Sequence, residues 1–316
     1  MFSFTKGGIH KTQRFIAITA LAAFLCLSMA LISCKAVQKE FKSPSEAVMA
    51  LVTAVKADSD RELLAVLGPE AGELIASGDD VADQRMKQNF LKAYEEQNRL
   101  EPDGDNFVLV IGKNDWPFTI PLVKKGDRWV FDTAAGKEEV LNRRIGKNEL
   151  DTIQVMLAIV DAQREYAMED RDGDSLLEYA RKFISEPGKK DGLYWPAQEG
   201  EDPSPIGELL ANARAEGYGS GGSEDNPEPY HGYYYRILTT QGNNAPGGAY
   251  DYIVNGRMIG GFAVIAYPAQ HGNSGVMTFV VNHDAMVFQK DLGENTAELA
   301  EAMTLYDPDE TWMPVQ

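Results

Sequence analysis

The sequence predicts an α+β protein with mainly antiparallel sheets, and two observations lead to this fold class. Stretches with apolar residues at helical spacing are twice followed by short runs that are rich in β-branched and aromatic residues. Turn sequences such as Lys125-Gly126-Asp127 and Asn255-Gly256 separate neighbouring runs, as expected for hairpins. Helices and strands grouped in this way are typical of an α+β fold.

The first half of the chain is predicted to form three helices followed by three strands. Ser43-Pro44-Ser45-Glu46 combines a serine cap, a proline in the first turn and the glutamate of a capping box, so a helix begins there. Ser59-Asp60-Arg61-Glu62 repeats this pattern for a second helix, which Gly68-Pro69 ends. The third helix is expected at 81–98, and the strands at 107–111, 118–123 and 129–131.

The second half is predicted to begin near Gly146 with a long helix that Asn148 caps and that ends near Met168. The other helices are expected at 175–184, 206–215 and 296–303. The strands are expected at 233–239, 250–254, 262–267, 276–281 and 286–290. These assignments divide the chain into an N-terminal α+β domain, residues 43–146, and a C-terminal α+β domain, residues 147–316.

Residues 1–33 resemble an export signal. Basic residues precede eighteen mostly apolar residues at 15–32, which is the order of the charged and apolar regions of a signal peptide. Leu31-Ile32-Ser33-Cys34 then resembles the lipobox of bacterial lipoproteins, where the cysteine receives lipid and the preceding peptide is removed. Two alternatives stay open, a cleaved signal without lipid and an uncleaved anchor, although eighteen residues are few for a spanning helix.

A lipid on Cys34 would attach the protein to a membrane and place it outside the cytoplasm, facing the periplasm or the cell exterior, with residues 34–42 as a tether. Lys35 stands where an aspartate would favour retention in the inner membrane, so the outer membrane is favoured where one is present. Cys26 leaves with the signal, so we expect no disulfide in the mature chain.

The net charge of the chain limits the classes of molecule that can bind to it. The formal net charge is −18, and residues 1–33 hold three basic and no acidic groups, which leaves 27 basic against 48 acidic residues, or −21. Such a surface repels nucleic acid and anionic lipid, and it keeps the protein soluble. We therefore expect no nucleic-acid partner, and other exported envelope proteins remain candidates.

An acidic segment is a candidate calcium site. Oxygen ligands at alternate positions with a further carboxylate four residues on suit a hard cation, and the residues concerned are Asp170, Asp172, Asp174 and Glu178. The glycine of this segment does not stand where a regular EF-hand loop has it. The alternative is a solvated acidic turn in which Asp174 caps the next helix.

Five segments resemble the bacterial domain-of-unknown-function 2950 family. They are 143–150 (RRIGKNEL), 230–238 (YHGYYYRIL), 241–248 (QGNNAPGG), 275–282 (GVMTFVVN) and 289–293 (QKDLG). The resemblance covers nearly the whole mature chain and implies an exported protein. The family has no assigned activity, so the resemblance implies no mechanism.

Two weaker resemblances concern the fold of each half. Helices followed by a meander resemble the cone-shaped fold related to nuclear transport factor two. The second half resembles the heads of type II secretion pseudopilins through Asn148-Glu149, 162–166 (AQREY) and 263–268 (AVIAYP). Pseudopilins carry a prepilin helix continuous with the head, whereas a lipobox and about a hundred residues intervene here.

The sequence leaves two classes of function open, and it shows no catalytic constellation. The favoured hypothesis is a non-enzymatic structural or protein-interaction role in the cell envelope. The alternative is a small-molecule-binding protein or hydrolase with a pocket near His231 and His271 or in the N-terminal domain. A deep pocket with clustered polar groups would favour the alternative, and a broad exposed apolar patch would favour a protein partner.

Overall fold

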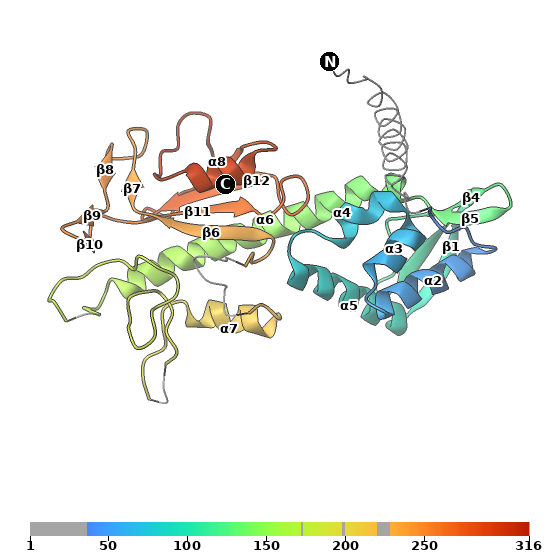
Figure 1. Ribbon diagram of the computed structural model, residues 1–316, viewed down its shortest axis with the longest axis horizontal. Helices are drawn as coiled ribbons and strands as arrows, with labels where there is room; N and C mark the ends of the chain where they lie inside the picture. Colours follow the sequence, from blue (N-terminus) through green and yellow to red (C-terminus); the bar gives the residue numbers. More distant parts are fainter. Residues whose placement is uncertain (1–36, 172, 198–199, 220–227, 316) are drawn as a thin grey trace, which may run out of the picture. The chain divides into compact units, whose positions relative to one another are not determined.

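A computed structural model describes residues 37–171, 173–197, 200–219 and 228–315, and it confirms the α+β class (Figure 1). The predicted signal segment, residues 1–33, and Cys34 lie outside the described residues, as does Asp172. Within the described ranges, every helix is too short or too polar to cross a membrane.

The N-terminal helices begin at the caps that the sequence predicts. In α2 (Pro44–Lys56) the Ser43 hydroxyl accepts a hydrogen bond from the Glu46 amide, and in α3 (Asp60–Leu67) Ser59 accepts from Glu62. Each serine thereby satisfies one of the amides that have no partner inside the helix. The other helices of this half are η1 (Pro69–Ala71), α4 (Gly72–Ile75) and α5 (Asp80–Glu96).

An antiparallel sheet follows these helices. Its strands are β1 (Asn98–Asp103), β2 (Asn106–Ile111), β3 (Trp116–Pro117), β4 (Leu122–Lys125) and β5 (Arg128–Phe131), in the order β1-β2-β4-β5 with β3 also paired to β2. The sequence does not predict β1, because that strand is polar and mostly exposed at the sheet edge. Strand β1 forms because all six of its residues pair with β2 through the backbone. Its side chains do not show the alternating apolar pattern by which a strand is predicted.

Helix α6 (Thr133–Tyr166) is much longer than predicted. We expected a helix to begin at Asn148, but Asp132 caps α6 by accepting from the Ala135 amide, and the helix continues through Gly146. Gly146 has open space around its Cα, so a glycine there weakens the helix without interrupting it. The predicted division between residues 146 and 147 therefore falls within one continuous helix; it stays a prediction.

The C-terminal half is built on a second antiparallel sheet with the order β14-β13-β12-β11-β6. These strands are β6 (Tyr233–Leu238), β11 (Ala263–Pro268), β12 (Met277–Asn282), β13 (Val287–Asp291) and β14 (Met313–Pro314). Two small sheets pair β7 (Thr240–Gln241) with β8 (Tyr250–Asp251) and β9 (Ile253–Val254) with β10 (Arg257–Met258). Strand β11 is buried along its whole length, because α6 and α8 (Thr296–Ala302) both pack on it.

The prediction of a helix at 175–184 is wrong, whereas α7 (Gly207–Ala215) lies where a helix was expected. The buried Gln163 side chain accepts from the Ala180 amide at 2.9 Å and donates to the Ala180 carbonyl at 2.8 Å. The Tyr179 amide donates to the Met258 carbonyl. Because these tertiary bonds use the backbone groups that a helix would need, the segment stays irregular.

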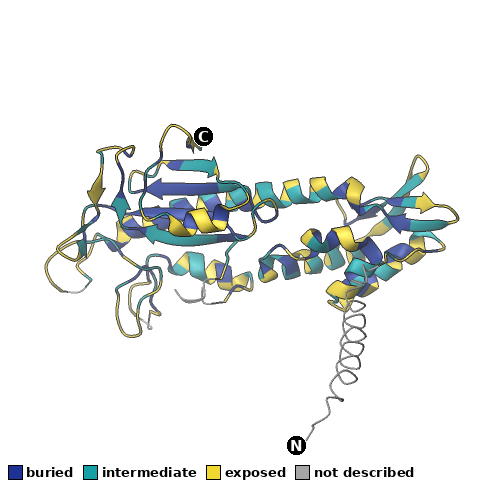
Figure 2. Ribbon diagram, turned by 45° about the horizontal axis from the view of Figure 1, so that its top comes forward, coloured by how far each residue is buried: buried dark blue, intermediate teal, exposed yellow. Residues whose placement is uncertain are grey.

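Two apolar cores result, and α6 contributes to both (Figure 2). Val140 and Leu141, near its start, pack against the core of the N-terminal half. Val155 to Tyr166, near its end, belong to the core of the C-terminal half. Helix α6 therefore runs along the molecule as a shared wall of both halves (Figure 1).

Segments that carry the family resemblance meet on α6. The Asn148 side chain donates to the Ser274 carbonyl at 2.9 Å, and the Glu149 carboxylate accepts from the Val276 and Met277 amides, each at 3.0 Å. These bonds attach the turn between β11 and β12 to the middle of α6. The two segments are therefore structural partners.

Candidate functional site

A deep pocket of about 550 Å³ lies in the N-terminal half, within the size range of small-molecule sites. Its apolar interior is formed by side chains from α2, α3, α5 and the sheet, among them Leu51, Leu67, Phe90, Ile111, Phe118 and Ile120. Val140 closes one side from α6. The structure thus supplies the feature that favours a ligand-binding protein.

Helix α5 borders the pocket with apolar side chains that pack against the N-terminal core but are only partly buried. Asp83 is the one fully buried residue that we find along its described length. Phe90 and Ala93 are only partly buried, and Met86 is 40% exposed, yet all three line the pocket. The inner face of α5 therefore contributes both to the edge of the N-terminal core and to the pocket wall.

The mouth of the pocket is lined by cations. Among the described residues the lining holds one acidic side chain, Asp83, and these basic ones: Arg85, Lys87, Arg143, Arg144 and Lys147. The guanidinium of Arg143 lies 5.0 Å from the ring centroid of Trp116, which is 56% exposed. A cationic lining with an exposed aromatic side chain is unexpected in so acidic a chain.

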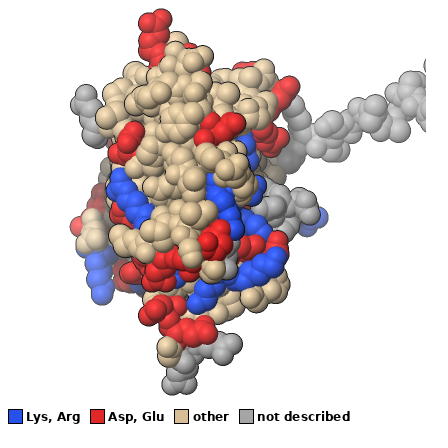
Figure 3. Space-filling model, turned by 90° about the vertical axis from the view of Figure 1, so that its left-hand side faces the viewer, with Lys and Arg blue, Asp and Glu red and all other residues tan. Residues whose placement is uncertain are grey.

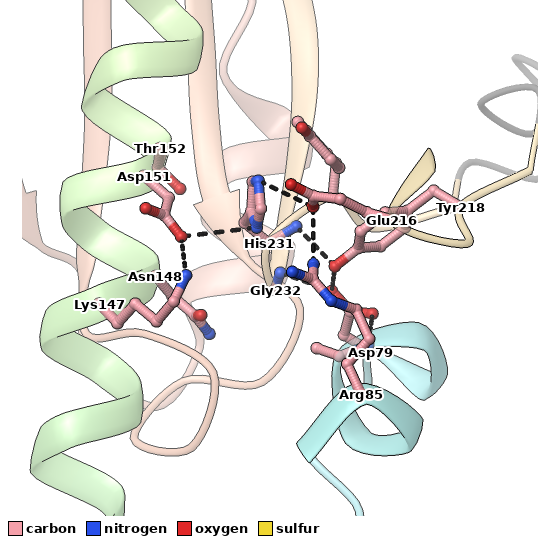
Figure 4. Close-up of polar contacts among 12 residues, drawn as sticks. Asp79, Arg85, Lys147, Asn148, Asp151, Thr152, Glu216, Tyr218, His231 and Gly232 are labelled. Atoms are coloured by element: carbon pink, nitrogen blue, oxygen red, sulfur yellow. Dashed lines mark hydrogen bonds and ion pairs between the residues drawn. The ribbon is translucent and has the colours of Figure 1, made fainter. Parts of the chain in front are cut away.

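His231 borders the pocket and lies between two ion pairs (Figure 4). Its Nδ1 lies 3.5 Å from the Asp151 carboxylate and its Nε2 lies 3.6 Å from Glu216. Asp151 also pairs with Lys147, and Glu216 pairs with Arg85 at 2.7 Å. These contacts connect α6, the His231 loop, the end of α7 and α5.

The backbone and ring of His231 are both constrained. Its φ is +52°, in the left-handed region that is uncommon for residues other than glycine, although Asn, Asp and His adopt it more often than the rest. The imidazole lies 4.1 Å from the Tyr230 ring, centroid to centroid. Burial lowers the pKa of His231 and outweighs the Asp151 and Glu216 carboxylates, which act in the opposite direction. A strained residue at a pocket edge is typical of functional sites.

We expect this buried histidine to make stability depend on pH. Because its pKa is lowered in the folded protein, the unfolded chain, with a pKa near 6.5, binds more protons as the pH falls below that value. The free energy of unfolding should therefore decrease from pH 7 to pH 5. Urea unfolding of the wild type and of His231→Asn, which tolerates the left-handed backbone, measures this. Equal pH profiles for the two proteins would contradict the assignment.

Asp79 joins the two halves beside the pocket. It is 1% exposed, and its Oδ1 caps α5 by accepting from the Ala82 amide at 2.9 Å. Its Oδ2 accepts from the Tyr218 hydroxyl at 2.9 Å and from the Gly232 amide at 2.8 Å (Figure 4). One carboxylate therefore fixes the start of α5 against the His231 loop.

Arg144 is a second buried link. Its guanidinium donates to the carbonyls of Glu73 at 2.8 Å and Leu74 at 2.7 Å, and to the side-chain oxygen of Asn273. Burial lowers the pKa of this guanidinium, whereas burial raises the pKa of Asp83 across the pocket. Because its hydrogen bonds go to the protein, Arg144 holds the wall together instead of offering a free cation.

The acidic residues of the predicted calcium site lie elsewhere, in the C-terminal half. Asp174 and Glu178 both pair with Arg257, and the Asp170 carboxylate accepts from the backbone amides of residues 173, 174 and 175. Asp174 caps no helix and accepts from the Leu176 amide instead. Within the described residues no cluster of three metal-ligating side chains is found. A calcium site stays a prediction, because Asp172 is not described.

The three histidines of the mature chain lie in different surroundings. His231 is at the pocket, as one form of the alternative hypothesis expected. His271 pairs with Asp291 at 2.8 Å on the turn between β11 and β12, and it does not line the pocket. His283 has its Nδ1 3.4 Å from the Phe262 carbonyl. The structure therefore places His231, and not His271, in the lining of the pocket.

Several residues of the site were not identified from the sequence. Asp79, Asp151, Glu216 and Tyr218 come from three separate segments, and their partners are far away along the chain. The position of Asp79 before a predicted helix was a cap signal that could have found it. For Asp151, Glu216 and Tyr218, the neighbouring sequence contains no signal of a functional role.

Comparison with known proteins gives one match. Neither a curated protein nor a solved structure matches the chain, so the resemblances to pseudopilin heads and to the nuclear transport factor two cone stay predictions. The family model described as Protein of unknown function (DUF2950) matches residues 38–315. The match spans nearly all of the chain after the signal segment, so the protein belongs to the DUF2950 family.

Proposed function

We propose that this protein is an envelope lipoprotein, anchored through Cys34 outside the cytoplasm, that binds a small molecule with a large apolar part without transforming it. The observation that carries this proposal is the pocket of about 550 Å³, whose lining is mainly apolar and also includes basic side chains. Pockets of this size and polarity are typical of small-molecule sites. The export signal and lipobox support the location.

A pocket-filling substitution tests this function. Val140→Trp places a large ring in the pocket from α6, whereas Leu150→Trp places the same ring on an exposed part of the same helix, where Leu150 is 68% exposed. The probe is N-phenyl-1-naphthylamine, a neutral apolar dye that fluoresces when it leaves water. Fluorescence titration should show binding to the wild type and Leu150→Trp, and an affinity lower by about tenfold for Val140→Trp, a difference of about 1.4 kcal/mol.

Two results would contradict the proposal. The dye would fail to bind the wild type, or Val140→Trp would bind it as tightly as the wild type does. Because Val140 is partly buried next to a hollow, we expect its substitution to leave the melting temperature close to that of Leu150→Trp. A comparison of the two melting curves separates a filled pocket from an unfolded protein.

Contact with other exported proteins is a second candidate. Figure 3 shows the end of the molecule that carries β9 and β10, where charged side chains gather in the lower part and are few in the upper part. Val254 and Ile259, on and beside these short strands, are 43% and 44% exposed. Exposed apolar surface of this kind supports a partner-binding role, but it names no partner chemistry.

A further inference from the structure

The charges at the mouth of the pocket indicate which class of molecule enters it. Resting on the proposed function, we propose that the ligand is a single-chain amphiphile with an anionic head. Its apolar chain lies along Phe90, Phe118 and Ile120, and its head is held at the mouth by Arg143 and Lys147 with Arg85 nearby.

The first argument is the contrast between the pocket and the rest of the chain. The protein after residue 33 has 27 basic and 48 acidic residues, yet the lining holds five basic side chains and, among the described residues, only Asp83 as an acidic one. A cleft lined by one sign of charge concentrates ligands of the opposite sign. An anionic ligand is therefore attracted to the mouth of this pocket, while the acidic surface repels it elsewhere.

The second argument is that the mouth cations are accessible. The side chains of Arg85, Arg143 and Lys147 are 37%, 44% and 66% exposed. Their carboxylate partners are Glu216, Glu139 and Asp151, and none of these three lines the pocket. Exposed ion pairs of this kind are weak, so an anionic head can share these cations from the pocket side.

The third argument is the separation of polar and apolar groups. The cations Arg143 and Lys147 are one turn apart on α6, and Val140 precedes Arg143 by three residues, so all three lie on one stripe of the helix. Val140 packs against the apolar core of the N-terminal half, and the Lys147 side chain is 66% exposed. This order along α6 matches an apolar chain with a charged end, and a uniformly polar anion would leave the interior unfilled.

Three amphiphiles with the same chain test the proposal: lauric acid, 1-dodecanol and dodecylamine, below the concentrations at which they aggregate. Native mass spectrometry, with all three competing for the whole protein, reports which is bound. We expect laurate to be preferred over both others by about tenfold or more, as charge-assisted hydrogen bonds to the head provide. In Arg143→Gln/Lys147→Gln that preference over dodecanol should disappear.

A matched control pair is present in the chain. Lys125 is 68% exposed and pairs with Glu40, and Arg164, 46% exposed on α6, pairs with Asp161. Neither Lys125 nor Arg164 lines the pocket. Lys125→Gln/Arg164→Gln removes the same net charge and should keep the wild-type preference for laurate.

The outcomes separate this inference from the proposed function. Equal binding of dodecanol and laurate, a preference for dodecylamine, or loss of the laurate preference in both double variants would overturn the anionic head while leaving a ligand-binding pocket. Binding of none of the three chains would overturn both proposals. If the preference for laurate is lost in Arg143→Gln/Lys147→Gln but kept in Lys125→Gln/Arg164→Gln, the result supports Arg143 and Lys147 as the site of the anionic head.

Discussion

Replacing Asp79 with alanine is expected to lower the free energy of unfolding by about 3–5 kcal/mol. The substitution removes the cap of α5 and leaves the Tyr218 hydroxyl and the Gly232 amide without their acceptor in a buried place. A lost cap costs about 1 kcal/mol, and each buried donor without a partner costs about 1–3 kcal/mol.

Urea unfolding of Asp79→Ala, Tyr218→Phe and Asp80→Ala measures this. Tyr218→Phe removes one of the three hydrogen bonds and should cost about 1–2 kcal/mol. Asp80 is the exposed neighbour at the start of α5. Asp80→Ala should lower the free energy of unfolding by less than about 1 kcal/mol, mainly because it removes an interaction with the helix dipole. If Asp79→Ala were no more destabilised than Asp80→Ala, Asp79 would not join the two halves as described.

The second large effect concerns two glycines of α6. Gly136→Ala should destabilise the protein by about 1–3 kcal/mol, although alanine is the better helix former. A Cβ at residue 136 would clash with the Thr119 carbonyl oxygen and lie 2.9 Å from the Ile120 Cα, both backbone atoms that cannot rotate away. Thr119 and Ile120 line the pocket, so the clash should also reduce ligand binding.

Gly146→Ala is the matched control in the same helix. Because no atom lies within 4 Å of the position its Cβ would take, the substitution should stabilise the protein by about 0.5–1 kcal/mol. Thermal and urea unfolding of the two variants should therefore shift in opposite directions. A shift in the same direction for both would mean that α6 does not approach Thr119 as closely as the structure has it.

Local signals predicted much of the fold. Ser43 and Ser59 cap the helices that they were expected to cap, and the strands of the second sheet lie close to their predicted positions. Caps and turns act over a few residues, so they can be read from the sequence alone. The α+β class follows from such signals, because it depends only on which segments are helices and which are strands.

The wrong or missing predictions concern segments whose structure depends on contacts with distant parts of the chain. The backbone of residues 179–180 is held by Gln163 and Met258, and β1 is held by its pairing with β2, so neither segment shows its structure locally. The candidate site follows the same rule. His231 and a pocket in the N-terminal half were both named as possibilities, but only the fold brings Asp79 and Glu216 to them.

A crystal structure of the protein grown with lauric acid tests the central claim most directly. The account predicts a chain-shaped density between α5 and α6 beside Phe90 and Phe118, with the carboxylate next to Arg143 and Lys147. An empty pocket with the fatty acid bound on another surface, or a pocket closed by the side chains of α5, would contradict it.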